Sequence, residues 1–157
     1  MVEFHVTATA QVPVGRAWSV LTDWEAHGRW VPLTGVRTTR ARTATDHGEF
    51  VATTRLGPFR LIDRMTVTSW SPPTTRPASS GRVELRKLGP HLAGGAVLEL
   101  VPGPNGVTRL DWYEDARPAS STLAHLAGAA DAVIRPVARR IFARVLARAV
   151  REMEEQG

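Results

Sequence analysis

The last quarter of the chain constrains the fold most, because Ser120 to Glu155 has one continuous helical pattern. A helix of that length spans roughly 50 Å and needs a long surface to lie on. The preceding hundred or so residues have mostly strand patterns. We therefore expect a single antiparallel sheet curved around one long helix, with a hollow between them that is a candidate ligand site. The apolar stripe of the helix recurs at steps of three and four: Leu123, Leu126, Ala130, Ile134, Val137, Ile141, Val145, Ala149 and Met153.

Alternating apolar and polar residues, bounded by turn residues, predict seven strands in this α+β chain. Short turns between successive strands favour antiparallel pairing. The segment 89–95 (GPHLAGG) is predicted as a bend or loop, and Pro136 should kink the long helix. The predicted strands are 3–12, 36–42, 49–56, 59–70, 82–88, 96–101 and 107–115, with short helices at 14–21 and 24–31.

The composition excludes several classes of function. The chain has 157 residues and no cysteine, so we expect one domain without disulfides or thiolate metal sites. No nucleophile elbow, phosphate loop or dinucleotide fingerprint occurs, and the histidines form no cluster, so no cofactor or metal is expected. No apolar run has transmembrane length, and the start of the chain lacks the features of a signal peptide. A cytoplasmic location is the default expectation.

Of the twenty basic residues, all except Lys87 are arginine. Six arginines lie on the predicted long helix, where they form either a solvated face, with Arg148 near Glu152, or a patch for a polyanion. No aromatic residues interleave them as a base-stacking surface requires, so no nucleic acid partner is expected. Peripheral contact with an anionic membrane stays open, as does the oligomeric state. The six are Arg135, Arg139, Arg140, Arg144, Arg148 and Arg151.

The layout of the chain resembles the START-like, or helix-grip, superfamily (SRPBCC), which includes bacterial polyketide cyclase/dehydrase-like proteins. The resemblance covers nearly all of residues 1–157 as a single domain. It implies a helix-grip fold with a deep hydrophobic cavity for apolar or amphipathic small molecules, and its members include lipid carriers, hormone receptors and aromatase/cyclases. The stretches that carry it are VTATAQVPVGRAWSVLTDWEAHGRWVPL, DRMTVTSWSPP, and LRKLGPHLAGGAVLELVP leading to TRLDWYEDARP.

Two carboxylates interrupt apolar strand faces. Asp63 shares the predicted inward face of its strand with Phe59 and Met65, and Glu114 follows Leu110 and Trp112 on theirs. An inward acid is unfavourable unless it is paired or hydrogen-bonded. Each acid either pairs with an arginine or caps a backbone group, or else it anchors a polar group of a ligand or acts as an acid/base with a raised pKa.

The predicted cavity is mostly apolar and has a volume of some 300–1,000 Å³. Small residues in 124–133 (AHLAGAADAV) leave room beneath the first part of the long helix, and Trp30 could border the mouth. The predicted ligand-binding residues are Asp63, Met65, Leu110, Trp112, Glu114, Trp30, Leu126, Ala130 and Ile134.

Three hypotheses for function follow. The first is a binding protein for a hydrophobic or amphipathic small molecule, which includes lipid binding. The second is a polyketide cyclase/dehydratase-type enzyme that uses acid/base residues in the same cavity; no catalytic residue is assigned. The third is an interaction module that works through the basic helix, and it expects a filled core and salt-dependent binding to polyanions.

Overall fold

The computed structural model describes residues 2–43, 46–121 and 131–155, with the backbone alone for 131–134. The order of elements is the predicted one: a strand, short helices, six further strands and a long helix. The strands are β1 (Val2–Ala10), β2 (Thr34–Arg40), β3 (Glu49–Leu56), β4 (Phe59–Ser71), β5 (Gly81–Pro90), β6 (Leu92–Pro102) and β7 (Thr108–Pro118). The helices are α1 (Val14–Leu21), α2 (His27–Trp30) and α4 (Asp131–Glu155), with short 3₁₀ turns η1 (Trp24–Ala26) and η2 (Pro104–Gly106).

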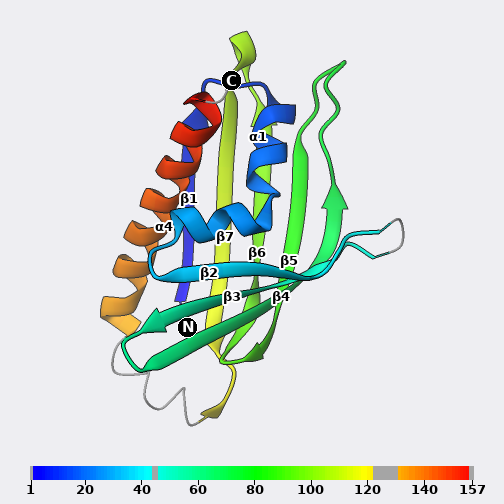
Figure 1. Cartoon of the computed structure of the whole chain (residues 1–157). Helices are drawn as coiled ribbons and strands as arrows, with labels where there is room; N and C mark the ends of the chain where they lie inside the picture. The colour runs from blue at the N-terminus through cyan, green and yellow to red at the C-terminus, as the bar shows by residue number, and fades with distance from the viewer. Residues whose placement is uncertain (1, 44–45, 122–130, 156–157) are drawn as a thin grey trace.

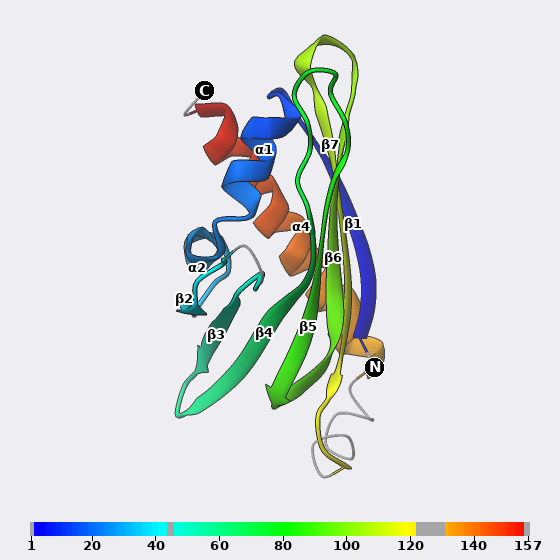
Figure 2. The ribbon, with the colours of Figure 1, turned by 90° about the vertical axis from the view of Figure 1, so that its right-hand side faces the viewer.

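The seven strands form one antiparallel sheet in the order β1-β7-β6-β5-β4-β3-β2 (Figure 1). The strands β2, β3 and β4 curl away from the plane of the others, and α1, α2 and α4 all lie on the concave side (Figure 2). The predicted α+β helix-grip architecture is confirmed. None of the helices among the described residues has the length and apolar character of a membrane span.

The core lies between α4 and the strands at the β1 edge of the sheet. Period-2 alternation buries Phe4, Val6 and Ala10 of β1, as predicted. The Phe4 ring packs on Phe142 of α4 with centroids 4.8 Å apart. The C-terminal half of α4 completes the core with Val145, Leu146, Ala149 and Met153.

The predicted apolar stripe is wrong at the beginning of the described part of α4. Val137 is 50% and Ile141 is 38% exposed, whereas Ala138 and Phe142 face the sheet and pack on the core. An α-helix turns by 100° per residue, so a row of steps of four drifts by about 40° per step and by roughly 160° between Val137 and Met153. The buried face of α4 stays opposite the sheet. Residues spaced four apart therefore do not all remain on that face, and those at the beginning of the described helix face solvent.

The assignment of Phe59 to a buried face is also wrong, since its side chain is 74% exposed. Phe59 pairs with Leu56 beside the two-residue turn Gly57–Pro58, where Gly57 has a φ of +61°. The alternation along β4 is correct further in, where Val67 is buried. The hairpin projects beyond the described helices (Figure 2), so Phe59 at its tip is exposed within the described part of the chain.

The segment 89–95 is not a loop, because β5 runs to Pro90 and β6 begins at Leu92. Its glycines allow close approach between strands. A Cβ on Gly95 would lie 2.6 Å from the Leu85 carbonyl oxygen, and one on Gly94 would lie 2.3 Å from that of Asp115. The predicted second short helix is likewise divided, into η1 and α2. Pro136 lies inside α4.

Gly81, the first residue of β5, lies where the sheet packs against Trp18 of α1. A Cβ at this position would lie 2.6 Å from Pro73 Cδ and 2.7 Å from Trp18 Cε3. Because Trp18 is buried and packs edge-on against Trp70, it cannot move aside freely. We expect Gly81→Ala to lower the free energy of unfolding by about 1–3 kcal/mol in a urea titration.

The matched control is Gly35→Ala, where nothing lies within 4 Å of the added Cβ. Its effect should stay within about 1 kcal/mol of the wild-type value. Equal effects for the two substitutions would contradict the packing of Trp18 against Gly81.

Candidate functional site: a cavity with one charged end

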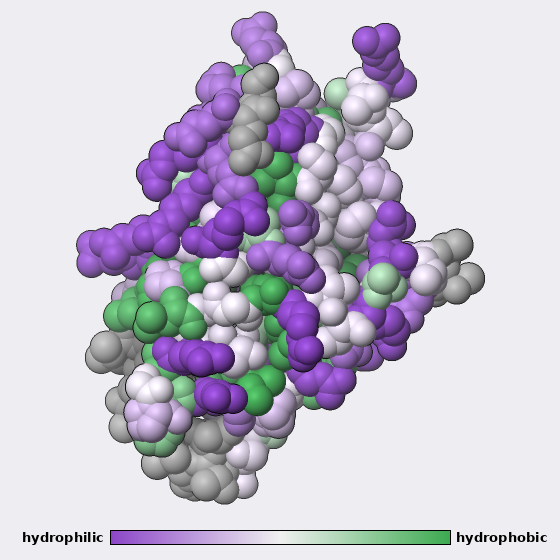
Figure 3. Space-filling view, in the orientation of Figure 1, coloured by the Kyte–Doolittle hydropathy of each residue, from purple (hydrophilic) through white to green (hydrophobic). Residues whose placement is uncertain are grey.

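A cavity of about 320 Å³ lies between the concave face of the sheet and the helices. Aromatic and aliphatic side chains form most of its wall, and Figure 3 shows apolar side chains gathered over β2 to β4 and the adjoining turns of α4. A cavity of this size suits a small organic molecule. Its apolar lining includes Phe4, Trp24, Val36, Phe50, Ala52, Leu61, Met65, Leu85, Trp112, Ala138 and Phe142.

The wall of the cavity carries three ionisable side chains in contact. Lys87 Nζ lies 2.5 Å from Asp63 Oδ2 and 2.7 Å from Glu114 Oε1. The indole N–H of Trp112 donates to Glu114 Oε2 at 3.0 Å. The side chains of Lys87, Asp63 and Glu114 are only 2%, 13% and 7% exposed. We call Asp63, Lys87 and Glu114 the charged cluster.

Three different strands hold the charged cluster. Asp63 lies on β4 and Lys87 lies on the adjacent β5. Glu114 lies on β7, which β6 separates from β5. Neighbouring strands are about 4.8 Å apart, so the Lys87 side chain must reach across β6 to contact Glu114. The inward positions of β6 there are Gly94, which pairs with Lys87, and Ala96, which pairs with Glu114. These small residues leave a path for the lysine side chain.

The charges in the cluster shift one another's pKa values. Burial raises the pKa of Glu114 and of Asp63, against the opposite effect of the Lys87 charge. Burial alone would lower the pKa of Lys87, but the charges of Glu114 and Asp63 outweigh it and raise that pKa. Lys87 therefore stays protonated, and its single charge can compensate only one of the two carboxylates.

His27 of α2 also lines the cavity, and it is neutral. Its Nε2 donates to the carbonyl oxygen of Leu21 at 2.8 Å, and burial lowers its pKa to about 4. Its ring lies 5.5 Å from that of Trp112. Since Nε2 carries the hydrogen, Nδ1 is an acceptor and not a donor.

The structure brings four of the predicted ligand-binding residues together in the cavity wall: Asp63, Met65, Trp112 and Glu114. Leu110 and Trp30 are buried elsewhere in the core and do not line the cavity. Leu126 and Ala130 lie outside the described residues, as does the side chain of Ile134. That these residues bind a ligand stays a prediction.

The partner of the two acids is Lys87, and not an arginine as one of the alternatives expected. The sequence carried a signal for it. Val83, Leu85 and Lys87 alternate with the exposed Arg82 and Arg86, so Lys87 falls on the buried face of β5. It is also the only lysine in a chain that otherwise uses arginine.

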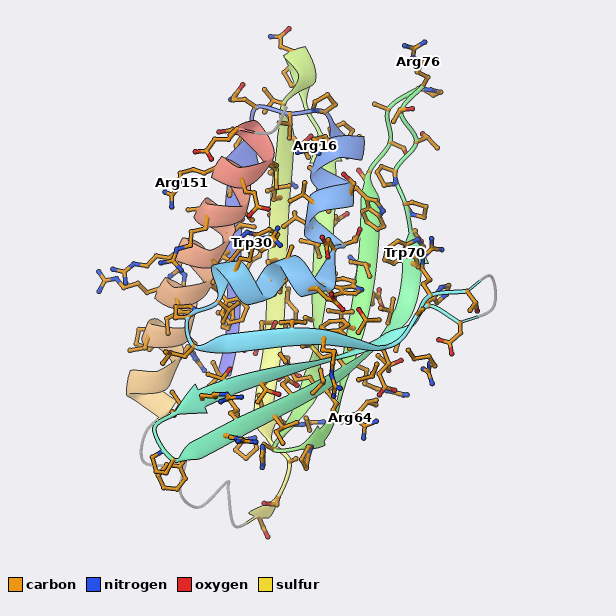
Figure 4. All side chains as sticks on the ribbon, viewed as in Figure 1. Arg16, Trp30, Arg64, Trp70, Arg76 and Arg151 are labelled. Atoms are coloured by element: carbon orange, nitrogen blue, oxygen red, sulfur yellow. The ribbon has the colours of Figure 1, made fainter. Side chains whose placement is uncertain are left out.

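The arginines of α4 lie on its outer side, and Figure 4 shows Arg151 projecting away from the body of the protein. The guanidinium of Arg148 donates to the Trp30 carbonyl oxygen at 2.9 Å. Glu152 accepts from Arg29 and, at 2.7 Å, from Trp30 Nε1. This contact joins α2 to α4. Membrane contact through the remaining arginines stays a prediction.

In residues 2–43, 46–121 and 131–155, no three His, Asp or Glu side chains are placed to hold a metal ion. The arrangement in the cavity combines a mostly apolar wall with one charged, hydrogen-bonding cluster. Such a site can hold a small molecule in a fixed orientation, or exchange a proton with it through a carboxyl group.

The sequence matches the family model described as "Polyketide cyclase / dehydrase and lipid transport" over residues 1–154. The chain belongs to this family. A comparison with curated proteins gives no match.

Solved structures similar to this chain share its fold. A protein from Thermus thermophilus has a TM-score of 0.73 at 9% identity, over 98% of this chain and 97% of that one. A START superfamily protein from Mycobacterium smegmatis has a TM-score of 0.67 at 16% identity, over 98% and 97%. The Zhui aromatase/cyclase from a Streptomyces species has a TM-score of 0.65 at 15% identity, over 98% and 94%. These identities support a common fold and no common ligand.

Lys87→Met tests the charged cluster, because it leaves two buried carboxylates without a cation. We expect it to lower the free energy of unfolding by about 3–5 kcal/mol at pH 7. Both carboxyls have raised pKa values in the folded protein, so the folded state binds more protons than the unfolded chain. Its stability should fall as the pH rises through these values and recover as the pH drops towards 4.5, the ordinary value for a glutamate.

Denaturant titrations at several pH values measure this effect. Arg86→Met on the same strand is the control, since it removes an exposed positive charge and should leave stability within about 0.5 kcal/mol of wild type. A Lys87→Met loss that does not recover at low pH would contradict the electrostatic cause.

Proposed function

We propose that this protein binds a hydrophobic or amphipathic small molecule in the cavity between the sheet and α4. One observation carries the proposal: an apolar cavity of about 320 Å³ whose wall includes a buried, charged hydrogen-bonding cluster. Apolar walls supply affinity through the removal of apolar surface from water, and a few polar groups fix orientation. Membership of a family described by polyketide cyclases, dehydrases and lipid transport agrees with such a ligand.

The cavity also separates this proposal from an interaction module that works through the basic helix, which expects a filled core. Here the inner faces of β1, β3, β5 and β7 and the residues Ala138 and Phe142 of α4 surround space. Native mass spectrometry of protein purified from its own host would reveal a co-purified molecule.

Filling the cavity should weaken binding. Ala52 of β3 lines the cavity, so we expect Ala52→Phe to occupy the space of an apolar probe such as N-phenyl-1-naphthylamine. Excluding about 60 Å² of probe surface costs about 1.5 kcal/mol, which is roughly a tenfold loss of affinity. Probe fluorescence and quenching of Trp112 measure binding.

Val51→Phe is the matched control, because Val51 precedes Ala52 on the same strand and its side chain points to the opposite face. It should bind the probe as the wild type does. Equal probe affinity in both variants would place the binding site outside this cavity.

A cyclase/dehydratase-type enzyme is the second candidate, and the charged cluster favours it specifically. A carboxyl whose pKa burial raises, such as Asp63, holds a proton more readily than a solvated carboxyl and is therefore better suited to acid/base work. The similarity of the fold to the Zhui aromatase/cyclase agrees with this candidate.

Asp63→Asn separates the two candidates. In a binding protein, the substitution should change ligand affinity, and there is no turnover to lose. In an enzyme, it should lower turnover of a polyketide-like substrate by roughly 10²–10⁴-fold while binding is largely kept. Calorimetry and product analysis on the same preparations measure both. A lower melting temperature with unchanged affinity would remove Asp63 from the site.

A further inference from the structure

The charged cluster lacks one positive charge when both of its carboxyls are ionised. Asp63 and Glu114 then carry two negative charges, and Lys87 supplies one positive charge. Among the described lining residues, the remaining ionisable group is His27, which is neutral. The ionised cluster therefore has one uncompensated negative charge next to an apolar wall, where charge is poorly solvated.

The hydrogen-bond inventory of the cluster leaves one acceptor for a ligand. An ammonium group has three donors, and Lys87 Nζ directs them to Asp63 Oδ2, to Glu114 Oε1 and, weakly at 3.9 Å, to Met65 Sδ. The second oxygen of Glu114 accepts from Trp112. Asp63 Oδ1 is buried and has no hydrogen-bond partner within the described part of the chain. The free capacity of the charged cluster is thus Asp63 Oδ1, which is an acceptor that bears negative charge when this carboxyl is ionised.

We propose that the cavity binds apolar molecules that carry a protonated amine and rejects those that carry a carboxylate. The ligand's ammonium group donates to the Asp63 carboxylate, which turns its buried Oδ1 towards the ligand, and the positive charge brings the sum of charges in the cluster to zero. The apolar part of the ligand packs against Trp112, Phe142 and the other side chains of the wall. This inference rests on the proposed function, because it names the class of ligand for the same cavity.

The rejection of carboxylates follows from how Lys87 is used. A buried lysine at the end of an apolar cavity would ordinarily attract a fatty or aromatic acid. Here both of its close contacts are to protein carboxylates, so a ligand carboxylate would find no free strong donor on Lys87. It would also add a second uncompensated negative charge within a few ångströms of the first. A neutral alcohol can donate to Asp63 Oδ1, but it leaves the charge uncompensated.

The test compares three probes of matched shape at neutral pH by titration calorimetry: 2-naphthylmethylamine, 2-naphthalenemethanol and 2-naphthoate. Hydrogen bonds to charged groups are stronger than neutral ones, so we expect the amine to bind about ten- to a hundredfold tighter than the alcohol. The naphthoate should bind more weakly than both. Wild-type protein alone decides the ranking, so the test does not depend on any variant folding.

Asp63→Asn then locates the preference, because it leaves Lys87 and Glu114 as a neutral pair. The amine should bind this variant about as tightly as the alcohol does. Glu99→Gln is the matched control, since it removes a half-exposed carboxylate of β6 that pairs with Arg82, and it should keep the wild-type ranking.

Each outcome separates this inference from the proposed function. Tightest binding of the alcohol or of the naphthoate to wild type would overturn the amine preference and leave a small-molecule binding protein in place. An amine preference that survives Asp63→Asn would overturn the role of Asp63 Oδ1. Binding of none of the three probes would overturn the proposed function and, with it, this inference.

Discussion

The structure depends on one packing constraint: a single long helix has to cover one face of a seven-stranded sheet. Six gaps of about 4.8 Å make the sheet roughly 29 Å wide, whereas a helix with its side chains is about 10–12 Å across. The helix α4 therefore packs closely only near the β1 edge, where Phe4 contacts Phe142. The strands β2 to β4 curl over the remaining width (Figure 2). Space stays between them because no second long helix lies there in the described chain.

The charged cluster is a poor source of stability, which is an argument for a functional role. Removing two carboxylates and an ammonium group from water is unfavourable, and well-packed apolar residues of similar volume are often as stable or more so. By contrast, ion pairs such as Arg64–Glu49 and Arg109–Asp111 include an arginine side chain that is half or more exposed to water. The charged cluster is buried, and it forms part of the wall of the apolar cavity.

Local patterns determine much of the fold, so the sequence could predict it, whereas the site depends on contacts between distant segments. Alternation placed Phe4 and Glu114 on the inner face, but it could not show that the tip of the β3–β4 hairpin, with Phe59, projects past the helices. Asp63 and Glu114 were visible as acids on apolar faces, yet their meeting depends on the strand order from β4 to β7, which no local pattern contains. Gly94 suggested a loop, although it serves close contact between strands. Without that continuous β5–β6 pair, the reach of the buried lysine to Glu114 could not be derived.

The identity of the cation itself fits the geometry of the cluster. Arginine presents five donors in a rigid planar fork, whereas a lysine ammonium group is a compact charge with three donors on a flexible stem. Lys87 has three acceptors around it, on Asp63, Glu114 and Met65. A guanidinium group in the same place would leave donors unpaired in an apolar cavity, and an unpaired buried donor is costly. In a chain that otherwise uses arginine for its basic residues, this is the position where a small, fully bonded cation is required.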